Sequence, residues 1–257
     1  MTSTLNCFAG ALRYEFRMQL RRPAVWTLIL VVGVLLGILY LLPDPTDPAY
    51  VTVAERTQLF NGFLPIAYGI LLADRLARER RLHTDELLAS LPASVDSRLW
   101  GKYLGAVAAT AIPAALVYLM EISFIAITRL DASLLPLEVP AFAAIVLPTL
   151  LFVGAFSIVC TAVLPPPLYS ILFIGYWFWG NEVTPQQIPT LNCSLLTPNG
   201  LYARVGILGG DMTPTCRNSI AHISVAQAWA SIGLLLGLAT LAMAIGQFYL
   251  NWRAARR

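Results

Sequence analysis

One carboxylate stands inside an otherwise uncharged apolar run of this sequence. Glu121 lies within Leu104–Thr128, which carries no other charge. An ionisable side chain at the centre of a bilayer costs about 3 kcal/mol, so such residues are candidates for function. Glu121 follows Lys102 by 19 residues, about 28 Å of helix, which places it in the outer third of the run. Two interpretations stay open: the carboxylate reaches the outer interface, or it faces a path through the protein.

The four cysteines suggest no metal site. Cys7, Cys160, Cys193 and Cys216 form no CxxC pair and have no metal-ligand spacing. Cys193 and Cys216 fall in the segment 181–223, which we expect on the oxidising side of a membrane, where disulfides persist. A bridge between them and two free thiols both remain open, because spacing alone does not show that the Cα atoms come within bonding range.

The segment 77–103 mixes leucines with charges of both signs. Thr84 followed by Asp85 and Glu86 is typical of a helix start, with a hydroxyl cap and acids in the first turn. Pro92 would end that helix. The pattern predicts a short amphipathic helix suited to docking onto a cytoplasmic partner; the alternative is a solvated charged loop.

Nucleotide and nucleic-acid binding find no support in the sequence. The one Gly-Lys pair, Gly101-Lys102, is followed by Tyr103, and Asp96 stands where a P-loop has its first glycine. We therefore expect no ATP hydrolysis and no bound cofactor in this chain. The net charge of +3 gives no reason to expect nucleic-acid binding.

The composition is too apolar for a soluble domain and indicates that much of the chain lies in lipid. Only 12 % of the 257 residues are charged, 58 % are hydrophobic, and the mean hydropathy is +0.69. Soluble domains carry about 25 % charged residues. One globular core cannot bury this many hydrophobic residues. We therefore expect an all-α integral membrane protein with a single transmembrane domain, residues 1–257.

Six runs are candidate spans of about 20 residues. Four are clear: 24–42, 104–128, 141–164 and 225–250. Thr57–Leu76 begins and ends polar, and the aromatic run within 168–183 is short for a bilayer. Pro165, Pro166 and Pro167 predict a tight turn before that run. Its aromatic residues form either an interfacial belt, which we favour, or a wall that contacts a substrate.

The basic residues favour six spans with both termini in the cytoplasm. With the N-terminus inside, 13 of the 17 Lys and Arg residues lie inside and four, Arg56, Arg129, Arg204 and Arg217, lie outside. This asymmetry matches the positive-inside rule. Loss of one weak span would move the C-terminal arginines outside.

Residues 1–22 predict an interfacial helix. Leu5, Phe8, Leu12, Phe16 and Leu20 form one apolar stripe, and Arg13, Arg17 and Arg21 lie on a neighbouring face. Such a helix lies at the cytoplasmic surface with its cations on anionic lipid headgroups. A solvated basic flank is the alternative.

Together these features resemble the type-2 permease family of ABC exporters. The resemblance rests on an N-terminal helix ending in RRPAVW (Arg21–Trp26), six spans in about 250 residues, and the loop ARERRLHTDELLASLPASVDSRLWGKYLG (Ala77–Gly105). In that family such a loop forms a coupling helix that sits in a groove of the ATPase subunit. The matching residues here are Glu79, Arg80, Arg81, Thr84, Asp85, Glu86, Leu87, Leu88, Leu91 and Pro92. The family also has a partly re-entrant segment between spans five and six, which matches the short fifth span and the segment 181–223.

The resemblance implies a permease subunit of an exporter in a prokaryotic plasma (inner) membrane. It would act as a homodimer, or with a second permease, and ATP and Mg²⁺ would bind to a separate ABC ATPase subunit. Two alternatives stay open. One is a mechanotransmission or assembly subunit that moves no substrate. The other is an intramembrane enzyme, although Glu121 has no obvious partner in the sequence.

Overall fold

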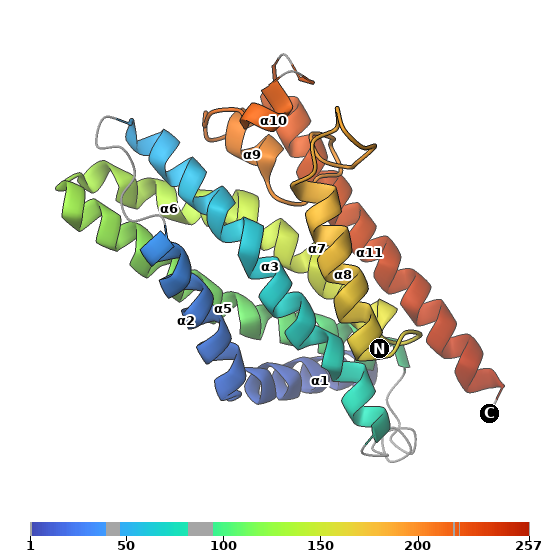
Figure 1. Ribbon diagram of the computed structural model, residues 1–257. Helices are drawn as coiled ribbons and strands as arrows, with labels where there is room; N and C mark the ends of the chain where they lie inside the picture. Colours follow the sequence, from blue (N-terminus) through green and yellow to red (C-terminus); the bar gives the residue numbers. More distant parts are fainter. Residues whose placement is uncertain (1, 40–46, 82–94, 218, 221, 257) are drawn as a thin grey trace.

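The chain folds as a bundle of helices in a computed structural model that describes residues 2–39, 47–81, 95–217, 219–220 and 222–256 (Figure 1). All regular secondary structure in these ranges is helical. The prediction of an all-α fold is therefore confirmed for the described part of the chain.

The first half of the bundle consists of α1 (Thr2–Leu20), α2 (Pro23–Leu39), α3 (Ala49–Arg81) and α5 (Val95–Arg129). Both α3 and α5 reach into the region predicted as the loop 77–103, and α3 starts eight residues before the predicted span at 57. The helices therefore extend beyond the predicted spans, because hydropathy marks where the apolar surroundings end, whereas helical hydrogen bonds continue through polar residues.

The predicted fourth span is longer and less regular than its apolar run. It comprises η1 (Ala132–Leu134), α6 (Leu135–Ala141), the π-helical η2 (Phe142–Val146) and α7 (Leu147–Cys160). The amide of Leu147 donates to the carbonyl of Phe142, five residues earlier. Pro148 follows and has no amide hydrogen to donate to the preceding turn. The wider π-helical turn therefore lies directly before the position where an α-helical hydrogen bond cannot form. The helical stretch thus runs from 132 to 160, whereas the apolar run predicted as a span covers 141–164.

The second half contains α8 (Pro166–Asn181), α9 (Leu201–Gly206), α10 (Pro214–Arg217) and α11 (Val225–Ala255). The predicted turn before α8 is present after Cys160, but Pro166 and Pro167 belong to the first turn of α8. Proline fits there because the first amides of a helix need no partner within it. At 16 residues, α8 spans about 24 Å.

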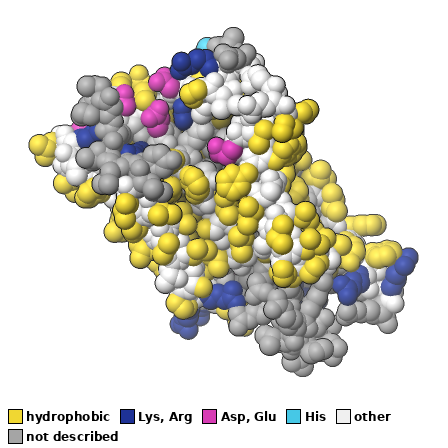
Figure 2. Space-filling view, in the orientation of Figure 1, with side chains coloured by type: hydrophobic (Ala, Val, Ile, Leu, Met, Phe, Trp, Pro, Cys, Tyr) yellow, Lys and Arg dark blue, Asp and Glu magenta, His cyan; other side chains and the backbone are white. Residues whose placement is uncertain are grey.

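By length and composition, three helical stretches among the described residues could cross a membrane, and a fourth if the bent pair of α1 and α2 counts as one. The three are 96–129, 132–160 and 225–253. Helix α8, at 16 residues, is too short to be counted as a span by length. Helix α3 carries polar or charged residues toward both of its ends. Hydrophobic side chains cover the middle of the face in Figure 2, and Lys and Arg lie at its ends.

The two ends of the bundle differ. Both termini lie at the end where α1 is packed and where α3 finishes, whereas α9 and α10 lie at the opposite end (Figure 1). Helix α1 packs on α5, α8 on α3, and α11 on α7. The core between these helices contains Trp177, Tyr68, Tyr118 and Phe60, all almost completely buried.

Candidate functional site

The structure describes only part of the predicted coupling segment. Glu79, Arg80 and Arg81 lie on the last turn of α3, at the end of the bundle that holds both termini (Figure 1). The other residues predicted for coupling lie outside the described residues: Thr84, Asp85, Glu86, Leu87, Leu88, Leu91 and Pro92. The helix predicted from the Thr84 cap thus stays a prediction.

Glu121 has a charged neighbour that sequence reasoning missed. It is half-buried on α5, and its charge interacts favourably with Arg56 of α3, which is 7 % exposed. One turn earlier on α5, the hydroxyl of Tyr118 lies 2.6 Å from that of Thr57. The sequence offered no obvious partner for Glu121, and the structure places the charge of Arg56 near it. Arg56 lies 65 positions before it, and no local pattern joins the two.

Two further charges complete this cluster, which we call the outer charge cluster: Arg56, Glu121, Arg129 and Glu138. Arg129, at the end of α5, donates to the hydroxyl of Thr52 at 2.7 Å and interacts electrostatically with Arg56. The carboxylates of Glu138 and Glu121 both influence Tyr118. Two cations and two anions thus gather where α3, α5 and α6 meet. Charges taken out of water need partners of opposite sign. The charge of Arg56 acts favourably on Glu121, whereas Arg56 and Arg129 carry the same sign.

A second polar group joins α3 to α7 and to the outer segment. The amide of Asn61 donates to the hydroxyl of Thr149 at 3.0 Å and to the carbonyl of Pro198 at 3.3 Å. Thr149 donates to the same carbonyl at 2.6 Å, and Tyr68 donates to the carbonyl of Thr149 at 2.8 Å. All three side chains are buried. The outer segment is therefore attached to the interior of the bundle.

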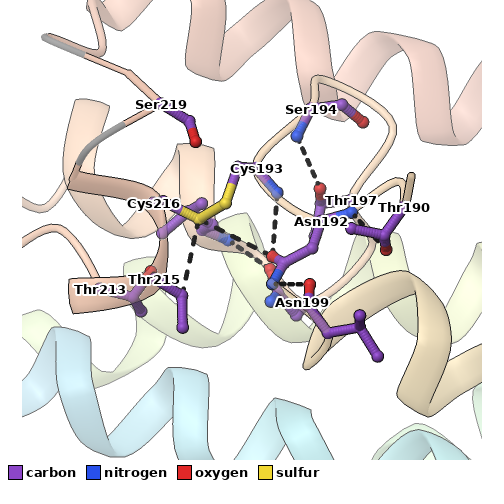
Figure 3. The surroundings of a disulfide bond; sticks show 12 residues. Thr190, Asn192, Cys193, Ser194, Thr197, Asn199, Thr213, Thr215, Cys216 and Ser219 are labelled. Carbon is purple, nitrogen blue, oxygen red and sulfur yellow. Dashed lines mark hydrogen bonds between the residues drawn. A yellow bond between two sulfur atoms is a disulfide. The ribbon is translucent and has the colours of Figure 1, made fainter. Parts of the chain in front are cut away.

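The outer segment 181–223 is closed by a disulfide bond. Cys193 and Cys216 are bonded, with their Cα atoms 5.4 Å apart, whereas Cys7 and Cys160 are free thiols. Figure 3 shows the bridge beside Asn192, whose side chain accepts from the amide of Cys193 at 2.9 Å and donates to the carbonyl of Val183 at 3.1 Å. Of the two alternatives left open by the sequence, the structure contains the bridge.

The same segment contacts the bundle at two more places. Gly200 precedes α9 with φ +84°, and a Cβ atom there would lie 2.3 Å from Ile145 in the π-helical segment. Only glycine tolerates both that φ and that contact. Arg204 of α9 donates to the side chain of Gln58 on α3 and to the carbonyl of Asp211. Burial lowers the pKa of its guanidinium, and the charges of Glu55 and Asp211 act in the opposite direction.

The aromatic residues of α8 do not all face the surroundings. Tyr169, Phe173 and Trp177 are buried, and the indole of Trp177 donates to the carbonyl of Gly62 on α3 at 2.7 Å. Phe178 and Trp179 are exposed. The favoured interpretation of an interfacial belt is wrong for the three buried residues, because they fix α8 against its neighbours.

Comparison with known proteins leaves the chain without a match: no family model matches it, and neither does any curated sequence. Within the described residues, no three His, Cys, Asp or Glu side chains are grouped closely enough to hold a metal ion. The arrangement can do two things chemically. It brings charges of both signs together between α3, α5 and α6, and it joins α3 to a disulfide-closed outer segment.

Proposed function

We propose that this chain is the membrane-spanning permease subunit of an ATP-binding-cassette exporter. Helices α2, α3, α5, the stretch from η1 to α7, α8 and α11 are the six spans, and both termini are cytoplasmic. Two such chains, or this chain and a second permease, form the pathway. Two separate ATPase subunits dock on the segment between α3 and α5.

The observation that carries this proposal is the position of the two helices that flank this segment. Helices α3 and α5, of 33 and 35 residues, end and begin at the end of the bundle that holds both termini and α1. A force applied there acts on α3, which bonds through Asn61, Gln58 and Gly62 to α7, the outer segment and α8. We expect movement at the cytoplasmic end of α3 to reach these contacts through the helix, which contains Pro65 between the two. Arg56 of the outer charge cluster lies on the same helix, and Glu121 of α5 is a candidate pathway residue.

The test is ATPase coupling. The chain is purified from its host membrane, a co-purifying P-loop ATPase is identified by mass spectrometry, and ATP turnover is measured with and without this chain. We expect R80E and E86R to abolish the stimulation of ATP turnover or the co-purification. R256E, which reverses a charge on the C-terminal turn at the same end of the bundle, is the matched control. Unchanged capture and stimulation in R80E and E86R would refute the proposal.

A subunit that transmits motion without moving a substrate is the second candidate. What favours it is the outer segment, which is closed by a disulfide and bonded to α3 and α7. Such a segment suits a partner on the outer side. Reconstitution with the identified ATPase separates the two: ATP-dependent accumulation of a compound inside inverted vesicles supports the exporter, whereas coupled ATP turnover without accumulation of any compound screened supports the transmitter.

A further inference from the structure

The acidic residue of the N-terminal helix, Glu15, is buried. The side of α1 that faces α5 contains Ala11, Glu15 and Gln19, and Glu15 and Gln19 are only 4 % and 0 % exposed. The contact is close because α5 has Gly101 and Gly105 there. A Cβ atom at Gly105 would lie 2.6 Å from the carbonyl oxygen of Leu12. Glu15, the acid of α1, therefore lies on the side that faces α5.

The exposed side of the C-terminal half of α1 is cationic. Arg13, Arg17 and Arg21 recur every four residues, which puts them on one side over about 12 Å of helix. They line a hollow of about 540 Å³ together with Gly10, Tyr14 and Met18, and Tyr14 is 66 % exposed. The described lining contains no acid. We call these three arginines and Tyr14 the α1 cationic surface.

The orientation of α1 suits a position at a membrane boundary. The axes of α1 and α2 form an angle of 59°, so α1 turns away from the direction of the predicted first span. At the junction, the indole of Trp26 donates to the carbonyl of Leu20 at 2.7 Å. Tryptophan with one apolar side and one hydrogen-bonding end is typical of the headgroup level.

A third side of α1 separates the contact with α5 from the cations. It contains Leu12, Phe16 and Leu20, which are half-buried. An apolar side next to a cationic side matches a lipid layer, in which acyl chains and phosphates occupy adjacent levels. An acidic protein surface would complement the cations but would give this apolar side no partner.

We infer that the α1 cationic surface binds the phosphate headgroups of anionic phospholipids of the inner leaflet. Guanidinium groups form paired hydrogen bonds with phosphate oxygens, which ammonium groups do not. The inference rests on the membrane location of the chain but not on its coupling to an ATPase, so each can fail without the other.

The experiment uses the full chain in neutral detergent, with dioleoylphosphatidylglycerol as the anionic probe and dioleoylphosphatidylcholine as the matched neutral lipid. Retained lipids are counted by native mass spectrometry. We expect the wild type to prefer phosphatidylglycerol, and the preference to fall about fivefold for each arginine removed in R13Q, R17Q and R21Q. High salt should also lower the preference for phosphatidylglycerol, because it screens the charges. A triple lysine variant, R13K/R17K/R21K, should keep part of the preference.

The control is R253Q/R256Q, which removes two arginines from the end of α11 and should leave the preference unchanged. An equal loss of the phosphatidylglycerol preference in this control would overturn the inference. Removing any two positive charges would then weaken lipid binding, wherever they lie. So would displacement of the lipid by an equal concentration of inorganic phosphate, which would indicate a free-anion site. A triple glutamine variant that keeps its lipid preference but loses its ATPase would assign the surface to a protein partner and also overturn it. Intact size-exclusion behaviour and an intact disulfide show that each variant is folded.

Discussion

The side-chain amide of Asn61 lies 3.0 Å from the hydroxyl of Thr149, and both donate to the carbonyl of Pro198. Three parts of the chain thus meet at one buried point: α3, α7 and the outer segment. Each buried group that loses its partner costs about 1–3 kcal/mol. The first prediction concerns this point. N61L and T149V should each lower the free energy of unfolding by that amount, and the double variant should lose less than the sum because the two side chains share partners.

Thermal unfolding in detergent, followed by tryptophan fluorescence, measures this effect. T128V is the matched control, since the hydroxyl of Thr128 is exposed and bonds only to carbonyls of its own helix. It should change the midpoint little. Strictly additive losses in N61L/T149V would show that the two side chains do not act together.

The second prediction concerns the disulfide. Cys193 and Cys216 are 23 positions apart, so their bridge restricts the unfolded chain by about 3 kcal/mol. C193S, C216S and the double variant should be destabilised equally, because each removes the same cross-link. A reductant should lower the midpoint of thermal unfolding of the wild type to that of the serine variants. It should lower the midpoint of the control C160S by the same amount as that of the wild type. Thiol labelling under denaturing conditions should find two thiols before reduction and four after it; four before reduction would contradict the bridge.

Much of this fold could be predicted from apolar runs, because helices in an apolar solvent need long uncharged stretches. The ends of the helices could not. Ala49 and Val95 begin α3 and α5 within stretches that hydropathy assigns to loops, since polar residues outside the apolar layer can continue a helix. The N-terminal helix was predicted with its apolar stripe and its arginines, yet the side that packs on α5 contains Glu15 and Gln19. Periodicity alone does not show which side meets protein and which meets lipid.

The candidate site was less accessible to sequence reasoning. Glu121 was recognisable as an isolated carboxylate, but Arg56 was counted only as a basic residue of an outer loop. Their proximity depends on how α3 crosses α5, and no local pattern encodes a crossing. The buried state of Trp177 was missed for the same reason: the sequence does not show whether an aromatic residue packs against lipid or against α3.

The third prediction concerns the contact between α1 and α5. A Cβ atom at Gly105 would lie 2.6 Å from the backbone oxygen of Leu12, which cannot move independently of α1. G105A should therefore shift α1 outward, and G105L should detach it. Gly10 of α1 has nothing within 4 Å of the equivalent position, so G10A is the control. Protease cleavage after the α1 arginines measures detachment. It should accelerate in G105L and stay slow in G10A; equal protection in both would contradict this close contact.

The last prediction concerns the outer charge cluster. Glu121 interacts with Arg56, and Arg129 adds a second positive charge nearby. E121Q removes one anion and leaves the two cations in a poorly solvated place, which should cost about 3 kcal/mol of the free energy of unfolding. The double variant R56Q/E121Q removes one charge of each sign and should recover part of that loss. E182Q, on an exposed residue just after α8, controls for the loss of an acid. If E121Q unfolds at the wild-type temperature, Glu121 and Arg56 do not stabilise each other. If stability falls as expected while transport by the reconstituted complex is unchanged, Glu121 holds α5 against α3 and does not contact the substrate.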